Sequence, residues 1–244
     1  MKLTGHTILI TGGASGIGRA LTEQFIQYNN ELIVVGRDEH KLNQLQLHYP
    51  SITTYVCNVG IEADLQLLID QLQHNHPKLN IIINNAGVQY NYSALDGTHT
   101  SQQMDEEIAI NLNAPINLTS QLLPLLASQS EAAVVNITSG LALVPKKSAP
   151  IYCATKAGLH IFTKALRYQL EHTNIKVFEI IPPVVDTNMT KGRGSNKISP
   201  DQLAAQFLTF FKKDRLEIPI GKVKWLILIN RISPALAERI LKNS

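Results

Sequence analysis

The chain is poor in cysteine, in charged residues and in long apolar runs. Its 244 residues include two cysteines, Cys57 and Cys153, which cannot form a disulfide framework and indicate a reducing compartment. Charged residues make up 17% and the net charge is +3, without a block of like charge, so we expect no nucleic-acid partner. The apolar run from Trp225 to Ile229 is too short to span a bilayer. We therefore expect a cytoplasmic protein without a targeting segment.

Short runs rich in β-branched residues alternate with longer amphipathic segments. This alternation is typical of an α/β protein with a parallel sheet, and strands that are apolar throughout predict helices on both faces. We predict a doubly wound, Rossmann-type fold that uses residues 1–244 as one domain. The predicted strands are Thr7–Thr11, Glu31–Val35, Ile52–Cys57, Asn80–Asn84, Ala132–Ile137, Ile175–Ile181 and a last one within Glu217–Lys222, and the predicted helices are Gly16–Tyr28, Asp38–His48, Glu62–His74, Ser101–Ala127, Ala149–His172, Pro200–Lys213 and Lys222–Lys242.

Glycines cluster between the first predicted strand and the first helix. Gly12, Gly16 and Gly18 follow the strand directly and open the helix. Glycine lets the backbone turn sharply and approach a ligand closely, and a helix N-terminus offers unpaired N–H groups to a pyrophosphate. The spacing differs from the commoner Gly-x-Gly-x-x-Gly pattern, and the alternative is a plain tight turn. The position between strand and helix favours a dinucleotide site.

The second predicted strand runs into Gly36 and Arg37, where many dinucleotide folds carry an acidic residue that binds the adenosine ribose. Gly36 has no side chain, and the guanidinium of Arg37 suits a ribose phosphate. This pattern favours NADP as cofactor, with NAD as the alternative. In the other interpretation, Arg37 only stacks on adenine and Asp38 caps the next helix.

Two further groups of polar and small residues follow predicted strands. The turn-forming tetrad Asn84–Gly87 ends the fourth strand, at the edge where such sheets bind ligands. Tyr152 and Lys156 share one helix face, and Ser139 follows the fifth strand. A tyrosine has a free pKa of about 10, and a nearby ammonium group favours the phenolate. We therefore expect Lys156 to lower the pKa of Tyr152, and Ser139 to hydrogen-bond a substrate carbonyl. Alone, such a Tyr–Lys pair is more often a surface pair.

These motifs, together with Asn111, resemble the short-chain dehydrogenase/reductase family in order and spacing from Thr7 to Thr187. The resemblance implies that Tyr152 is the general acid in reduction and the base in oxidation. It implies that Lys156 lowers the pKa of Tyr152 and holds the nicotinamide ribose, that Ser139 polarises the carbonyl, and that Asn111 positions a water linked to Lys156. The implied cofactor-binding residues are Gly12, Ser15, Gly16, Ile17, Gly18, Arg37, Asn58, Val59, Asn85, Ala86, Gly87, Tyr152, Lys156, Pro182, Val185 and Thr187.

The sequence departs from the family pattern at two positions. Asn58 stands where the family usually has an aspartate near the adenine amine, and its amide oxygen is still an acceptor. Pro183 replaces the usual glycine after the sixth strand, and it stiffens that loop because proline fixes φ and lacks an N–H. The C-terminal stretch, about residues 217–244, resembles DltE-like bacterial oxidoreductases.

We expect the substrate to bind at a loop of about residues 184–200. The candidate walls are apolar, which suits a hydrophobic carbonyl compound or alcohol. In that loop Lys191, Arg193 and Lys197 either close over an acidic group or form a solvated basic surface, and the second interpretation is the commoner one for a charged loop. The candidate walls are Tyr90, Leu141, Leu143 and Val144.

The leading hypothesis is an oxidoreductase that transfers a hydride between NADP(H) and a carbonyl or alcohol. The alternatives are a non-catalytic NADP-binding regulator or scaffold on the same fold, and an epimerase or dehydratase, for whose larger substrate domain the chain is short. The histidines and cysteines lack metal-ligand spacing, so we expect no metal. The family pairs its long helices, which predicts a homodimer or homotetramer. The apolar run Trp225–Ile229 has three alternative roles: it forms a subunit interface, lines the substrate pocket or contacts a membrane surface.

Overall fold

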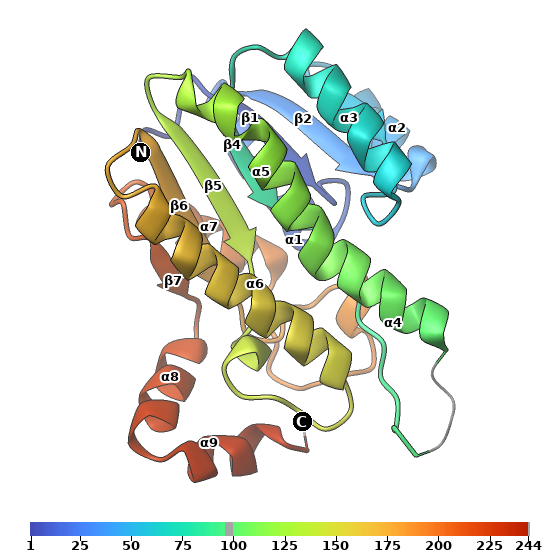
Figure 1. Cartoon of the computed structure of the whole chain (residues 1–244), viewed down its shortest axis with the longest axis vertical. Helices are drawn as coiled ribbons and strands as arrows, with labels where there is room; N and C mark the ends of the chain where they lie inside the picture. Colours follow the sequence, from blue (N-terminus) through green and yellow to red (C-terminus); the bar gives the residue numbers. More distant parts are fainter. Residues whose placement is uncertain (96–99, 244) are drawn as a thin grey trace.

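Seven parallel strands form one sheet in the order β3-β2-β1-β4-β5-β6-β7 (Figure 1). The structure is a computed structural model and describes residues 1–95 and 100–243. The register pairs Ile8 with Leu32 on one side of β1 and with Ile81 on the other. The strands are β1 (Thr7–Thr11), β2 (Glu31–Gly36), β3 (Thr53–Val56), β4 (Leu79–Asn84), β5 (Ala132–Ile137), β6 (Ile175–Ile181) and β7 (Glu217–Pro219).

Helices cover both faces of the sheet, because side chains alternate across each strand and both sets are apolar. Ile8 and Ile10 face a core built with α1, α2 and α7, and Leu9 faces a core built with α3, α5 and α6. The predicted Rossmann-type fold is therefore confirmed. The helices are α1 (Gly16–Ile26), α2 (Glu39–His48), α3 (Glu62–Asn75), α4 (Ser101–Ile108), α5 (Ala114–Ala127), α6 (Pro150–Gln169), α7 (Pro200–Phe211), α8 (Val223–Ile232) and α9 (Pro234–Leu241).

The strand order places β1 between β2 and β4, so the chain leaves the sheet in opposite directions on the two sides of β1. In sheets of this kind, ligands bind outside the carboxyl ends of the strands at such a switch point. The loops after β1, β2, β4, β5 and β6 all end at this edge, which positions the candidate site described below.

Two of the predicted helices differ from the structure. The stretch Ser101–Ala127 contains a π-helical turn, η1 (Ala109–Asn113), between α4 and α5. The predicted helix Lys222–Lys242 is wrong as a single element, because it breaks into α8 and α9 at Ser233. Ser233 is extended, with φ −145° and ψ 87°, as expected for a residue that precedes a proline, here Pro234.

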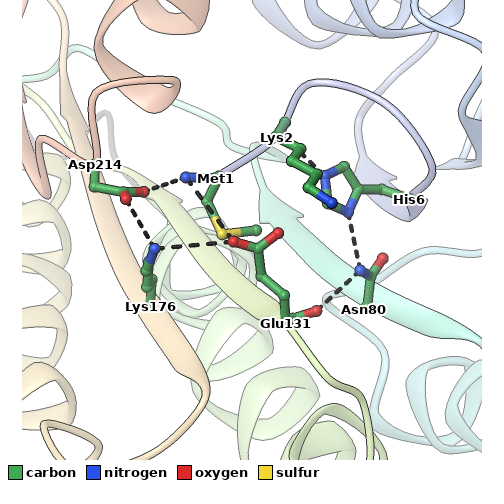
Figure 2. Close-up of polar contacts among 7 residues, drawn as sticks. All are labelled: Met1, Lys2, His6, Asn80, Glu131, Lys176 and Asp214. Atoms are coloured by element: carbon green, nitrogen blue, oxygen red, sulfur yellow. Dashed lines mark hydrogen bonds and ion pairs between the residues drawn. The ribbon is translucent and has the colours of Figure 1, made fainter.

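The start of the chain is fixed at the amino ends of β5 and β6, at the other end of the sheet (Figure 2). The Met1 amino group contacts the Asp214 carboxylate and lies 4.0 Å from Glu131. Lys176 Nζ donates to Asp214 at 2.9 Å. Asn80 connects His6 to the Glu131 carbonyl. These contacts join strands far apart in sequence. Within residues 1–95 and 100–243, no helix is both long enough and apolar enough to cross a membrane.

Candidate active site

The loop after β1 needs its glycines because it fits against the loop after β4. Gly12 has φ +66° and Gly16 has φ +52°, a left-handed region that glycine adopts at no steric cost. A side chain at Gly18 would overlap the Gly12 carbonyl and the Asn85 amide. Asn85 Nδ2 donates to the Thr11 carbonyl at 2.9 Å. The glycine loop after β1 and the Asn84–Gly87 tetrad after β4 are therefore in direct contact.

The N-terminus of α1 is left without a side-chain cap. Ser15 occupies the N-cap position, is exposed, and its side chain accepts no backbone N–H within the described residues. A Cβ atom at Gly16 would lie 3.1 Å from Thr187 Cγ2, so the loop after β6 lies over this helix start. Uncapped N–H groups beside a flexible-backbone loop form a site that suits a phosphate anion.

Arg37 and Asn58 extend this edge toward β2 and β3. Arg37 is exposed and donates to Glu106 Oε1 at 2.8 Å, and the hydroxyl of Tyr90 donates to Glu106 Oε2. Asn58 Oδ1 accepts from Gly60 N at 3.1 Å, so a local turn already uses the oxygen that we expected to be available to adenine. Val59 follows Asn58 and is buried in the core between the sheet and α3.

Tyr152, Lys156 and Ser139 come together where β5 and α6 meet. The Ser139 side chain lies close enough to the Tyr152 hydroxyl to lower its pKa. Ser139 Oγ also accepts from Leu141 N at 3.1 Å, which fixes the serine rotamer at the start of the short helix η2 (Gly140–Ala142). Lys156 Nζ lies 5.8 Å from the centre of the Tyr152 ring and donates to the Ile137 carbonyl at 2.9 Å.

Burial, rather than the lysine charge, dominates the ionisation of this group. It raises the pKa of Tyr152 to about 12, against a smaller lowering by the nearby Ser139 side chain, and it lowers the pKa of Lys156 to about 8. The predicted net lowering of the tyrosine pKa is thus wrong for this structure. The reason is that both groups lose their hydration, and the ammonium group is directed at a backbone carbonyl.

Asn111 lies in the π turn η1 and is fully buried. Its amide forms two hydrogen bonds with the Val88 backbone, from Nδ2 to the carbonyl at 2.8 Å and from the Val88 N–H to Oδ1 at 2.9 Å. A Cβ atom at Gly87 would lie 3.2 Å from Asn111 Oδ1 and 3.8 Å from Lys156 Nζ. Asn111 therefore fixes the loop after β4 beside Lys156, and the π turn gives its side chain that position.

A cavity of about 570 Å³ lies beside Ser139 and Tyr152. One side reaches the dinucleotide-type loops through Ile17 and Thr187, and the other is closed by α8 and α9. Trp225, Leu226 and Ile229 line it, which favours the substrate-pocket alternative for this apolar run. Pro182 and Val185 also line it, from the loop after β6.

Of the four predicted walls, Leu141 alone is among the residues that line this cavity. Tyr90 directs its hydroxyl to Glu106, while its neighbours Gln89 and Asn91 reach the cavity. Leu143 and Val144 follow η2, which turns the chain back, and Val144 is 1% exposed. In the 184–200 loop, Arg193 lines the cavity whereas Lys191 and Lys197 do not.

Sequence reasoning missed two charged residues near the site. Glu107 is fully buried, four residues before Asn111, and its Oε1 accepts from Tyr90 N at 3.0 Å. The sequence signal that could have identified Glu107 was a carboxylate on the apolar side of a predicted helix. Lys146 lines the cavity from the loop after η2, and no pattern in the sequence distinguishes it from its neighbour Lys147.

The fold and this arrangement define a class: α/β proteins with a dinucleotide-type glycine loop and a Ser–Tyr–Lys group beside it. The family model described as short chain dehydrogenase matches residues 6–198. The chain belongs to the short-chain dehydrogenase family of oxidoreductases.

Relatives agree with this membership, and solved structures share the fold. The "Uncharacterized oxidoreductase DltE" of Bacillus subtilis is 38% identical, over 93% of this chain and 92% of the relative. An uncharacterized oxidoreductase of Staphylococcus epidermidis is 30% identical, over 78% of this chain and 83% of the relative. A short chain dehydrogenase from Burkholderia cenocepacia, solved with NADP, superposes with a TM-score of 0.88 at 21% identity, over 99% of this chain and all of that one (100%). One from Sphingobium yanoikuyae, solved with NADPH, has a TM-score of 0.82 at 24% identity, with 96% of each chain covered.

Proposed function

We propose that this protein is an NADP-dependent carbonyl reductase or alcohol dehydrogenase in which Tyr152 is the general acid and base. The observation that carries the proposal is that Ser139 and Tyr152 lie next to each other in the wall of a mainly apolar cavity. The same cavity reaches the loops that are built like a dinucleotide site, through Ile17 and Thr187. A substrate in this cavity would lie next to the acid–base group Tyr152 and next to the proposed dinucleotide site.

The residues present fit a dinucleotide. The uncapped N-terminus of α1 and the close glycine loop would hold the pyrophosphate. The other predicted contacts are at the adenosine end and along the loops after β4 and β6, and Lys156 would hold the nicotinamide ribose. When bound, the nicotinamide supplies or accepts the hydride. The predicted contacts beyond the glycine loop are Arg37, Asn58, Val59, Asn85, Ala86, Gly87, Pro182, Val185 and Thr187.

NADP is favoured over NAD by the side chain at the end of β2. Arg37 is exposed and offers a planar guanidinium to the ribose phosphate, and Gly36 leaves room beside it. The solved structures named above contain NADP or NADPH, and one from Burkholderia phymatum, with a TM-score of 0.85 at 19% identity, was solved with NAD. NAD remains the alternative cofactor.

In reduction, Ser139 Oγ donates a hydrogen bond to the substrate carbonyl oxygen and Tyr152 gives its proton to that oxygen. With the hydride that a bound nicotinamide would supply to the carbonyl carbon, the product would be an alcohol, and Tyr152 would be left as phenolate. The positive charge of Lys156 stabilises this phenolate. Because burial raises the pKa of Tyr152 to about 12, the hydroxyl stays protonated near neutral pH, which suits the general acid of a reduction.

The test is a Tyr152→Phe variant, assayed for NADPH and NADH oxidation against a panel of aldehydes and ketones. We expect the loss of about 10²-fold or more in kcat, with unchanged NADPH binding in a separate titration. Tyr168→Phe, an exposed tyrosine on the same helix, is the matched control and should keep full activity. Full activity of Tyr152→Phe would contradict the proposal. Cofactor binding by the wild type without turnover of any compound would instead favour the non-catalytic regulator or scaffold.

We further propose that the protein is a cytoplasmic homodimer or homotetramer. The support for assembly is a stripe of exposed apolar side chains on α6, where Ile161 is 62% exposed and Tyr168 is 69% exposed. The two residues are seven apart and share one face of the helix. A covering subunit would remove this apolar surface from water.

A further inference from the structure

The cavity beside Tyr152 carries charge of one sign only. Lys146, Arg193 and the exposed Lys222 line it, and within residues 1–95 and 100–243 no aspartate or glutamate does. The Arg193 guanidinium donates to Asn91 Oδ1 at 3.2 Å and to the Met189 carbonyl. Both acceptors are neutral, so these contacts orient the guanidinium without neutralising its charge.

Lys146 is partly buried and has no ion pair in the part of the chain that the structure describes. Burial, and then the charge of Arg193, lower the pKa of its ammonium group, so the two cations lie close enough to repel each other. Two like charges in a partly dry cavity are unfavourable unless an anion joins them.

The neighbouring lysines of the same loops behave differently. Lys197 Nζ lies 3.4 Å from Asp186 and donates to the Thr190 carbonyl at 2.6 Å, so its charge is already paired. Lys191 and Lys147 are exposed and lie outside the cavity. Among the cations of these loops, Lys146 and Arg193 are therefore distinguished by being both partly buried and without an ion pair in the described residues.

Most of the rest of the cavity wall is apolar. Leu141 and Val184 contribute to it, as do Trp225, Leu226 and Ile229 of α8. A ligand that fits these walls would have a hydrocarbon body, and a ligand that fits the two cations would have a negatively charged group.

We infer that the substrate is an amphipathic anion, an apolar carbonyl compound or alcohol whose carboxylate or phosphate group binds Lys146 and Arg193. This inference rests on the proposed function for the carbonyl, and on the cavity alone for the anion. It assigns Lys146 and Arg193 as specificity-determining residues for the substrate, separate from the groups proposed to hold the cofactor.

Binding is measured without turnover by the fluorescence of Trp225, the only tryptophan of the chain, which lines the cavity. Octanoate, heptyl phosphate and the neutral octanamide share one heptyl chain, and each is titrated into the enzyme with and without saturating NADP⁺. We expect at least one of the two anions to bind about tenfold or more tightly than octanamide, as hydrogen bonds to charged groups predict. The tighter anion identifies the group as carboxylate or phosphate.

Two double variants test whether Lys146 and Arg193 cause the preference for an anion over octanamide. In a Lys146→Met, Arg193→Gln double variant, the ratio of anion to amide affinity should fall close to one, and NADPH affinity should not change. A Lys147→Met, Lys191→Met double variant removes the same number of charges outside the cavity and should keep the wild-type ratio. The inference is overturned if neither anion outbinds octanamide, if the preference survives in the first double variant, or if that variant weakens NADPH binding as much as anion binding.

Turnover separates this inference from the proposed function. The kcat/KM values of octanal and of 4-oxobutanoate, 6-oxohexanoate and 8-oxooctanoate are compared with NADPH as cofactor. Turnover of octanal without preference for any oxo acid supports the oxidoreductase and overturns the anionic substrate. Preferential binding of an anion without turnover of any aldehyde supports the anion site and contradicts the proposed reduction of aldehydes.

Discussion

Lys156 Nζ donates to the Ile137 carbonyl at 2.9 Å while lying 5.8 Å from the centre of the Tyr152 ring. The lysine thus has a fixed position next to the phenol, and its pKa of about 8 lies well below that of the tyrosine at about 12. As pH rises, Lys156 loses its charge first, and with it the stabilisation of the phenolate that reduction produces.

We therefore expect kcat/KM for carbonyl reduction to be level below about pH 8 and to fall above it. Lys156→Arg keeps its charge at high pH, so the falling limb should move upward toward the pKa of Tyr152. The measurement is the pH profile of both enzymes from about pH 6 to about pH 11. A falling limb at the same pH in both proteins would show that another group controls it.

Gly87 lies where a side chain would press on Asn111 and would contact Lys156. A Cβ atom there would lie 3.2 Å from Asn111 Oδ1, tighter than an ordinary contact. Gly87→Ala should therefore lower the free energy of unfolding by about 1–3 kcal/mol, the usual cost of overpacking, and reduce kcat. Gly36→Ala is the control, because its Cβ would meet Leu42 no closer than 3.7 Å. Equal unfolding free energies for the two variants would argue against this close contact.

The strands and the glycine loop were predictable because their signals are local. β5 and β6 have the bounds that apolar runs predict, and the glycines after β1 mark the turn between that strand and α1. The cavity was not predictable in the same way. Trp225 reaches it from α8 and Lys146 from the loop after η2, and no periodicity connects segments so far apart in sequence.

The electrostatics of the site could also be predicted only in part from the sequence. Spacing along one helix places Lys156 near Tyr152, but the sequence does not tell how much water each group loses on folding. Burial reverses the expected direction of the tyrosine pKa. In the same way, Arg37 pairs with Glu106, 69 residues away, a contact that follows from the sheet order and not from either local sequence.

Glu106 competes for the side chain that we propose to bind the ribose phosphate. Arg37→Gln should weaken NADPH binding by about tenfold or more, because it removes a charged donor. Glu106→Gln should strengthen it by about two- to fivefold, the range that a surface ion pair allows. Titrations with NADPH and NADH measure both effects, and NADH affinity should stay constant. If both cofactors change in parallel, Arg37 acts on the adenine and not on the phosphate.

Glu179 is fully buried on β6 and is held by two donors. Thr138 Oγ1 donates to its Oε1 at 2.7 Å, and His160 Nδ1 lies 2.7 Å from the same oxygen. His160→Ala should lower the free energy of unfolding by about 1.5–3 kcal/mol, because it removes a hydrogen bond to a buried carboxylate. His172→Ala, at an exposed histidine beyond the end of α6, should change it by less than about 0.5 kcal/mol. Chemical denaturation of both variants measures the difference, and equal values would rule out this role for His160.

The exposed stripe on α6 predicts the assembly state. Ile161 and Tyr168 present apolar surface on one helix face, and a neighbouring subunit that covers it would gain about 25 cal/mol for each Å² buried. Wild type should sediment as a dimer or tetramer, and Ile161→Glu with Tyr168→Glu should shift it toward monomer, because a carboxylate in a dry interface is costly. Leu228→Glu, at a 46% exposed position on α8, is the matched control and should leave the assembly unchanged. If the α8 variant dissociates the protein and the α6 variant does not, the subunits meet through the C-terminal helices instead.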